Sequence, residues 1–520
     1  MSDKKVTFKP YEQEQGLLFP DYMDEHIPTD HLVRTINTVI DSLNLSKLEQ
    51  NYKGGGASSY HPRMMLKVIV YAYSQKIYSS RGIAKALREN IFFMWLSGKN
   101  MPDFRTINLF RKNRLSGELK GLFTEIVRIL LDGGFVTMKD LFVDGTKLEA
   151  DANKYTFVWK KSTLRYKDKL TEQVKELFRY IDQLEMAEDH EYEGYDLPEM
   201  GERVTITSEE IKKRIEALNR SLGEQPDKEL KKVKKKLETD ALPRMQKYEK
   251  HLEIMDTRNS YSKTDPDATF MRMKDDHMRN GQLKAGYNIQ IGTENQYILA
   301  YNIYQKPTDT TLLPHFLDSF KEQYAMLPEN LIADAGYGSE ENYEYIESAE
   351  INCYVKYNMF HKEKKKKFKE NPYRVENLIY NSAEDNYTCP ADKKLFYAFD
   401  KEYITDNGFK TIRKIYECED CTGCIHRDHC HKSQYNRRIQ VSHRLNELKK
   451  NARDNLDSGK GLEYRSRRCV DVEPVFAQIK HNKEYKRFMR RGLEGVTSEW
   501  GLLSIVHNLT KLHNQQNALR

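Results

Sequence analysis

The chain has 520 residues, of which 38% are hydrophobic, 31% charged and 11% aromatic, and its formal net charge at pH 7 is +7. This length predicts three or four domains, and the aromatic content, which includes 33 Tyr, argues against wholesale disorder. No apolar run approaches the roughly 20 residues that span a bilayer, and the N-terminus has no signal-peptide core, so we expect a cytoplasmic protein without a membrane partner.

Helices are predicted for most of residues 30–134. One helix is expected over residues 30–48, a glycine triplet follows at residues 54–56, and helix-period apolar residues continue from His61. The last predicted helix, residues 104–115, carries basic and polar side chains and fits the reading helix of a helix-turn-helix-like DNA binder; a structural helix with an exposed basic face is the alternative. Its candidate DNA-binding residues are Arg105, Arg111, Lys112 and Arg114.

The chain changes character after residue 135. A short buried strand is predicted at residues 141–143, and it ends at Asp144. From about residue 160 to 260 the sequence is highly charged and has the spacing of long amphipathic helices, with a run of lysines at residues 231–236. This segment is predicted to be a helical hairpin inserted into another domain, either as a solvated antiparallel pair or as an arm that contacts DNA.

Strand signals return at residues 285–291 and 297–304, with a hairpin turn expected at residues 292–295. A helix over 311–326, a strand ending at Asp334, a strand over 353–357 and a late helix over 472–479 follow. This order predicts an α/β fold with an RNase H-like mixed sheet, interrupted by the helical insertion and by residues from about 360 to 460.

Three acidic residues in this order are candidate metal ligands. Asp144 and Asp334 each follow an apolar run, and Glu473 precedes Pro474 at the start of the late helix. Carboxylates from separate segments can hold two Mg²⁺ ions about 3.5–4 Å apart, which is the arrangement that catalyses phosphodiester chemistry. Weaker candidates for the same roles are Glu149, Asp151, Asp309, Glu463 and Glu484.

The end of the chain is basic around Glu473. Residues 431–520 contain 19 Lys and Arg against 9 Asp and Glu, which suits a polyanion near the site, although a solvated basic surface would have the same composition. Lys480 lies seven residues after Glu473, two helical turns along the same face, and is a candidate catalytic and phosphate-binding residue. The candidate DNA-binding residues here are Arg467, Arg468, Lys480, Lys486, Arg487, Arg490 and Arg491.

Five of the seven cysteines lie close together in the sequence. The spacing of Cys418, Cys421, Cys424 and Cys430 is typical of a tetrahedral Zn²⁺ site, and Cys389 lies upstream as a fifth candidate. Three nearby histidines could substitute for a cysteine, an iron–sulfur cluster has less support, and free thiols in a degenerate insert are the alternative.

The motifs at residues 141–160, 331–338 and 472–480, together with Arg490-Arg491-Gly492, resemble those of insertion-sequence transposases of the DDE class. The similarity extends to the Pro102-Asp103-Phe104-Arg105-Thr106 segment and covers about residues 10–515. The group that the chain resembles has an N-terminal helical domain and a cysteine-containing insert.

The resemblance implies an RNase H-like core in which Asp144, Asp334 and Glu473 bind two Mg²⁺ or Mn²⁺ ions. It implies strand cleavage and strand transfer at terminal inverted repeats and target DNA, by a homodimer on DNA in a bacterial, nucleoid-associated setting. It favours Cys389 over Cys418 as the fourth Zn²⁺ ligand. Tyr464 and Arg467 have the spacing of the family's Tyr and Arg but lie two residues too early.

The succession of patterns along the chain predicts the domain boundaries. They are a helical DNA-binding region at 1–134, the catalytic core at 135–160 and 261–358, the helical insertion at 161–260, the cysteine-rich insertion at 359–460, and a basic helical part of the core at 461–520. The alternative functions are an RNase H-like nuclease without strand transfer, or a DNA-binding regulator derived from a transposase.

Overall fold

The computed structural model describes residues 22–52, 59–189, 206–224, 228–273, 282–405 and 407–518. Its chain divides into two compact units, one with Met1–Gly133, Asn482–Glu484 and Trp500–Arg520 and the other with Gly134–His481 and Tyr485–Glu499. Within the described ranges, no helix is long and apolar enough to cross a membrane.

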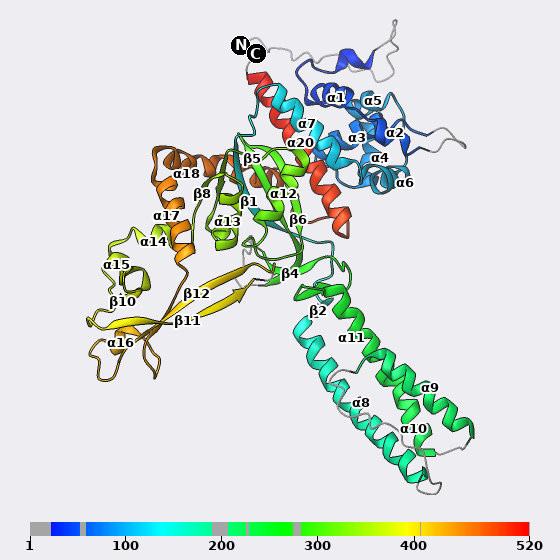
Figure 1. Cartoon of the computed structure of the whole chain (residues 1–520). Helices are drawn as coiled ribbons and strands as arrows, with labels where there is room; N and C mark the ends of the chain where they lie inside the picture. The colour runs from blue at the N-terminus through cyan, green and yellow to red at the C-terminus, as the bar shows by residue number, and fades with distance from the viewer. Residues whose placement is uncertain are drawn as a thin grey trace, which may run out of the picture. The chain divides into compact units, whose positions relative to one another are not determined.

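The first unit is helical, and its helices begin at side chains that accept hydrogen bonds from the first turn. The Ser79 hydroxyl accepts from the Gly82 N–H at 3.1 Å, and the Asp103 carboxylate accepts from the Thr106 N–H at 2.7 Å. Its elements (Figure 1) are η1 (Met23–His26), α1 (Leu32–Ser42), α2 (Ser46–Gln50), α3 (Pro62–Ser74), α4 (Ser80–Glu89), α5 (Ile91–Ser97), α6 (Phe104–Phe110), η2 (Arg111–Leu115), α7 (Leu119–Asp132) and α20 (Leu493–Ala518) from residue 500 on.

Two predicted helices of this unit differ in the structure. The helix expected over residues 30–48 is divided into α1 and α2 by residues 43–45. The helix expected over residues 104–115 is α-helical only in α6 and continues as the π turn η2, which widens the helix where its basic residues are concentrated.

A six-stranded mixed sheet forms the centre of the second unit. Strand β5 pairs antiparallel with β1 on one side and with β4 and β6 on the other, while β7 pairs parallel with both β1 and β8. The strands are β1 (Asp140–Glu149), β4 (Thr269–Arg272), β5 (Leu283–Glu294), β6 (Tyr297–Tyr304), β7 (Asn330–Ala333) and β8 (Asn352–Val355).

Strands β1 and β5 extend beyond their predicted limits, whereas β6 has its predicted bounds and β8 ends at Val355, earlier than predicted. Strand β1 continues past Asp144 to Glu149, so Asp144 lies inside a strand and the expectation of a strand end there is wrong. The hairpin turn also lies later than expected, at Asn295 and Gln296, whose φ angles are 52° and 63°. Positive φ at both central residues is typical of a two-residue turn that matches the twist of its strands.

Helices pack on several strands of the sheet. α12 packs on β6, α13 and α17 pack on β8, and α18 packs on β7. Their bounds are α12 (Leu313–Tyr324), η4 (Ala335–Tyr337), α13 (Glu340–Ser348), α17 (His443–Asp457), α18 (Gly459–Asp471), α19 (Glu473–Ala477) and the π turn η6 (Gln478–Asn482). The predicted helix over residues 472–479 is thus regular only in α19, and its last residues lie in the π turn.

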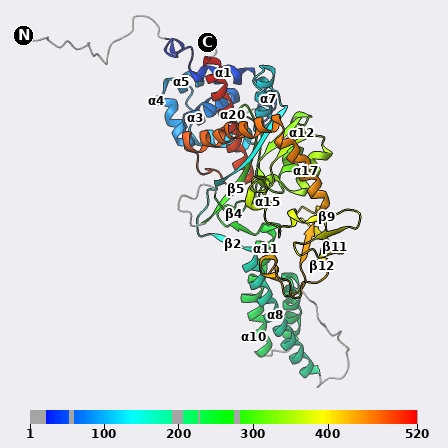
Figure 2. The same ribbon diagram turned by 90° about the vertical axis from the view of Figure 1, so that its left-hand side faces the viewer.

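A bundle of helices with its own hydrophobic core lies between β2 (Phe157–Trp159) and β3 (Ser260–Ser262). Its members α8 (Lys160–Asp189), α9 (Ser208–Glu224), α10 (Lys228–Lys236), the π turn η3 (Leu237–Ala241) and α11 (Leu242–Met255) run side by side (Figures 1 and 2). Because β2 and β3 pair with each other, the chain leaves and returns at one place.

Residues 360–441 contain a second sheet, which is wholly antiparallel in the order β13-β12-β11-β10-β9. Buried Leu395, Tyr416 and Ile439 form part of its small core. The elements are α14 (Phe360–Glu363), α15 (Lys366–Lys369), η5 (Val375–Asn377), β9 (Ile379–Asn381), β10 (Asn386–Thr388), β11 (Lys394–Ile404), β12 (Lys410–Cys418), α16 (Arg427–Cys430) and β13 (Arg438–Val441).

Candidate active site

The register of β1 and β7 places the two aspartates side by side. Val143 is the partner of Ala333 in this parallel pair, and the next residues along the two strands are Asp144 and Asp334. Residues at matching positions on neighbouring strands project from the same face of a sheet, so the two carboxylates lie together there.

Each aspartate accepts a hydrogen bond from a backbone amide that closely follows it in the chain. The Gly145 N–H donates to Asp144 Oδ1 at 2.8 Å, and the Gly336 N–H donates to Asp334 Oδ1 at 2.8 Å. The Oδ1 atom of each carboxylate is therefore held by the protein, and the Oδ2 atom of each lies toward Arg468 on α18.

Arg468, on α18, joins the two aspartates to Glu473. Its Nη2 lies 3.0 Å from Asp144 Oδ2 and 3.8 Å from Asp334 Oδ2, and its Nη1 lies 3.8 Å from Glu473 Oε1. One guanidinium can contact all three carboxylates only if they converge, although they are separated by long stretches of chain. The side chains of Asp334 and Glu473 are 40% and 58% exposed, so the cluster is open on one side.

Tyr337, Gln290 and Asp309 form a buried group of hydrogen-bonded side chains close to Gly145, the residue after Asp144. The Tyr337 hydroxyl donates to Gln290 Oε1, and Gln290 Nε2 donates to Asp309 Oδ1 at 2.8 Å. A Cβ atom at Gly145 would lie 2.2 Å from Gln290 Nε2, so glycine is required for this close approach. Burial, followed by the nearby aspartates, raises the pKa of Tyr337 well above its ordinary value, so its hydroxyl remains a neutral donor.

Lys356 is a neighbour of the site that the sequence reading missed. Ala333 is the partner of Val355, so Lys356 follows β8 at the position where Asp334 follows β7. Burial and the positive charge of Arg468 lower the pKa of Lys356, while Asp334 raises it. Lys356 is a charged residue directly after a buried strand, and this is the same sequence pattern that identified Asp334.

Lys480 lies in the π turn η6 and is only 5% exposed. The expected two-turn α-helical relation to Glu473 does not hold, because α19 ends at Ala477. Lys480 is therefore near Glu473 in the sequence, but its side chain is buried in the protein.

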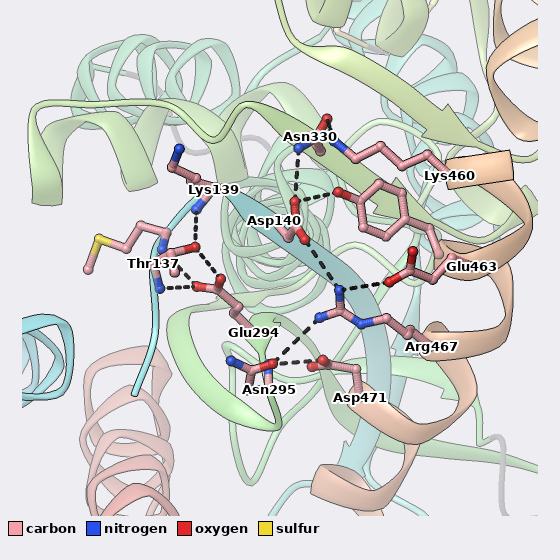
Figure 3. A network of polar contacts seen from close by, with 12 residues as sticks. Thr137, Lys139, Asp140, Glu294, Asn295, Asn330, Lys460, Glu463, Arg467 and Asp471 are labelled. Atoms are coloured by element: carbon pink, nitrogen blue, oxygen red, sulfur yellow. Dashed lines mark hydrogen bonds and ion pairs between the residues drawn. The ribbon is translucent and has the colours of Figure 1, made fainter. Parts of the chain in front are cut away.

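Tyr464 and Arg467 connect α18 to Asp140 at the beginning of β1, and Figure 3 shows Arg467 beside Asp140. The Tyr464 hydroxyl donates to Asp140 Oδ1 at 2.6 Å, and Arg467 Nη1 lies 3.4 Å from Asp140 Oδ2. At the end of the same helix, Asp471 accepts hydrogen bonds from the Asn295 and Gln296 amides at 2.9 and 3.0 Å. These contacts fix the helix that carries Arg468 and precedes Glu473.

The weaker acidic candidates all have other partners. Glu149 pairs with Lys284, Asp151 with Arg487 and Arg491, Asp309 with the Asn288 and Gln290 amides, Glu463 with Arg467, and Glu484 with Lys76. These contacts are all to residues other than Arg468.

The candidate DNA-binding residues of the first unit differ in exposure. Arg111 is buried, and its guanidinium donates to the Tyr78 carbonyl oxygen at 3.0 Å and to the Tyr73 hydroxyl. Arg114 lies over the Tyr52 ring at 3.6 Å. Arg105 and Lys112 are exposed, so these two are the ones available to a partner on the surface.

The basic residues after the site are also divided. Arg487 and Arg491 donate to Asp151, and Arg487 also donates to the Ala150 carbonyl oxygen at 3.0 Å. Arg490 is half-buried, and Lys486 is exposed. Arg487 and Arg491 therefore hold the segment after β1 in addition to any role on a ligand.

The cysteines of the second sheet are free thiols around one small cavity. Arg437 donates from its backbone N–H to Cys421 Sγ at 3.4 Å and from its guanidinium to Cys430 Sγ at 3.2 Å. Burial and the neighbouring Cys421 raise the pKa of Cys418 to about 12. The lining cysteines are Cys389, Cys418, Cys421, Cys424 and Cys430.

Neither the acidic cluster nor the cysteine cavity is arranged as a finished metal site. Among the residues that the structure describes, no group of three or more His, Cys, Asp or Glu side chains is placed to hold a metal ion. In the acidic cluster the centre is instead taken by the Arg468 guanidinium.

The second unit is thus a mixed α/β structure in which Asp144 on β1, Asp334 directly after β7 and Glu473 in α19 all lie close to Arg468. Two family models match the chain: "Transposase DDE domain" over residues 388–513 and "Transposase domain (DUF772)" over residues 21–113. Both matches indicate an insertion-sequence DDE transposase. The first match includes Glu473 and the cysteines, and no curated protein and no solved structure matches the chain.

Proposed function

We propose that this transposase cuts DNA at the inverted-repeat ends of its element and joins the freed ends to target DNA, using Asp144, Asp334 and Glu473. The observation that carries the proposal is the convergence of these three carboxylates on one guanidinium. The strand order supports it, because an antiparallel β1-β5-β6 set beside parallel β1-β7-β8 is the arrangement of an RNase H-like core.

The residues present suit a divalent metal. Hard carboxylate oxygens from three elements are the ligands that Mg²⁺ and Mn²⁺ prefer, and the exposed side of the cluster leaves room for phosphate and water. Such ions supply activation of the attacking oxygen and stabilisation of the leaving oxygen. Asp144 and Asp334 would hold them through the Oδ2 atoms, since the backbone amides already occupy the Oδ1 atoms.

The other parts of the chain have proposed roles in binding. Exposed Arg105 and Lys112 of the first unit, and Lys486, would contact the phosphates of the terminal repeats, where each contact adds salt-dependent affinity. The helical bundle between β2 and β3 and the cysteine-bearing sheet are proposed as insertions in the catalytic core. A homodimer would bring two ends together.

The test of the function is cleavage and joining of a DNA fragment that carries the element's own ends. Asp334→Asn removes one charge and keeps the size of the side chain, so we expect at least about a hundredfold loss of cleavage, in line with loss of a metal ligand. Binding of the uncut ends should remain within about threefold of the parent protein, since Asp334 is not a proposed DNA contact. Full cleavage by Asp334→Asn would refute the assignment.

Two alternatives remain distinguishable in the same assay. An RNase H-like nuclease would cut the ends and give no joined products. A DNA-binding regulator would bind the ends and show no metal-dependent cleavage.

A Zn²⁺ ion held by four of the five clustered cysteines is a separate proposal. The cavity that they share, and the two hydrogen bonds from Arg437 to sulfur, support thiolates at this place. Metal content of the purified protein should be one Zn²⁺ per chain and should fall in Cys424→Ser. Comparing Cys389→Ser with Cys418→Ser would decide the fourth ligand, and a metal-free parent protein would contradict the site.

A further inference from the structure

We propose that Arg468 is the resident counter-cation of the three carboxylates, and that it is displaced when a divalent metal binds. The inference rests on the proposed function, because it requires that the cluster bind metal. It adds a step to that function: Arg468 neutralises the carboxylates while no metal is bound, and it competes with the metal ion for them.

The contacts of Arg468 indicate a placeholder for a cation. Its two terminal nitrogens contact the oxygens that are not held by backbone amides, namely Oδ2 of each aspartate and Oε1 of Glu473. The 3.0 Å distance to Asp144 is that of a close ion pair, and the other two distances are 3.8 Å. The guanidinium is therefore shared among three carboxylates and makes one close ion pair.

Burial makes this ion pair costly to break in the absence of metal. Arg468 is 8% exposed and the side chain of Asp144 is 11% exposed, so removing the guanidinium would take a close positive charge away from a buried carboxylate. The Nε atom of Arg468 is buried and has no hydrogen-bond partner. The carboxylates thus hold the guanidinium by charge, but its Nε–H donor is unsatisfied there. The unsatisfied donor lowers the free-energy cost of moving the guanidinium out of the cluster.

The surroundings also favour release once the carboxylates acquire other cations. Lys356 adds a second positive charge at this end of the sheet, because it follows β8 at the position where Asp334 follows β7. A divalent ion carries more charge than a guanidinium and accepts several carboxylate oxygens at once. After displacement, the guanidinium is free at the edge of the site, where its planar fork suits a DNA phosphate.

Arg467 is a matched control because it is the neighbouring residue on the same helix with a different partner. Its guanidinium pairs with Asp140 and lies over the Phe142 ring at 5.2 Å. Neutralising Arg467 removes one positive charge from α18 and leaves the ion pair between Arg468 and Asp144 in place.

The experiment measures Mn²⁺ binding by calorimetry and thermal unfolding with and without Mn²⁺, on the full chain in the absence of DNA. We expect Arg468→Gln to bind Mn²⁺ at least about tenfold more tightly than the parent protein, because the competing cation is gone. It should unfold at a lower temperature without metal and recover with Mn²⁺. Arg468→Lys keeps the charge and should lie between the two, and it remains informative if Arg468→Gln does not fold without metal.

The outcomes separate this inference from the proposed function. Equal Mn²⁺ affinity in the parent protein, Arg468→Gln and Arg468→Lys would overturn the displacement and leave the metal site intact. Weaker binding in Arg468→Gln would also overturn it, because Arg468 would then support the metal. Absence of Mn²⁺ binding in all variants, including the control Arg467→Gln, would refute both.

Discussion

Replacing Asp140 with Ala should loosen α18 from the central sheet, although Asp140 is not one of the three converging acids. Its carboxylate accepts hydrogen bonds from Asn330 Nδ2 at 2.9 Å and from the Tyr464 hydroxyl at 2.6 Å, and it pairs with Arg467 at 3.4 Å (Figure 3). The loss has two unequal parts. A buried tyrosine hydroxyl without a partner costs about 1–3 kcal/mol, and a half-exposed ion pair contributes about 0–1 kcal/mol.

The expected decrease in the free energy of unfolding is therefore about 1–4 kcal/mol for Asp140→Ala. Urea unfolding, followed by the fluorescence of the protein, measures it. Tyr464→Phe deletes the hydroxyl together with its need for a partner, so it should cost only about 1 kcal/mol. Glu463→Gln changes a neighbouring charge that is 63% exposed and should stay within about 0.5 kcal/mol of the parent protein.

The same variants should also affect DNA cleavage in a graded manner. Asp140→Ala should reduce cleavage more than Tyr464→Phe does, because α18 positions Arg468 and leads into Glu473. A stability of Asp140→Ala within about 0.5 kcal/mol of the parent would refute the reasoning, since no named contact would then be lost. A larger loss in Glu463→Gln than in Asp140→Ala would do the same.

Three further substitutions test the packing around the site. Gly461→Ala should destabilise by about 1–3 kcal/mol in urea unfolding, because its Cβ would lie 2.1 Å from the Asn455 carbonyl oxygen; an unchanged midpoint would contradict this. Gly145→Ala should reduce cleavage by displacing Gln290, and unchanged kinetics would show that the buried group of Tyr337, Gln290 and Asp309 is not needed. Burial lowers the pKa of Lys483 from 10.5 to about 8, so its charge destabilises the folded state fully below pH 8 and ceases to do so above about pH 10.5. Lys483→Met should therefore be more stable at pH 7, with the advantage shrinking as pH rises through that window, and a pH-independent difference would refute the assignment.

The sequence was sufficient to find the three acids and most of the order of the strands. Apolar runs that end in an acid can be recognised in the sequence alone. The Asp334 strand and strand β6 occur where the pattern placed them. The limits of β1 were missed because its second half, from Gly145 to Glu149, lacks an apolar run and is buried by pairing with β5 instead.

Other features depend on tertiary contacts that no local pattern encodes. Arg468 was predicted only as a DNA contact, because nothing in its neighbourhood distinguishes it from Arg465 or Arg467. Its position among the carboxylates results from the side of α18 that faces β1 and β7. The π turn after Ala477 likewise required the structure, since the spacing of residues 472–479 fits a regular helix equally well.

Asp471 provides a way to observe the site from a distance. Its carboxylate holds the amides of Asn295 and Gln296 at the tip of the β5–β6 hairpin, and it lies two residues before Glu473. A displacement of the α18–α19 junction must therefore strain or break these two hydrogen bonds. The hydrogen-exchange rates of the Asn295 and Gln296 amide protons should therefore change when metal binding displaces this junction, and they can be measured without a DNA cleavage assay.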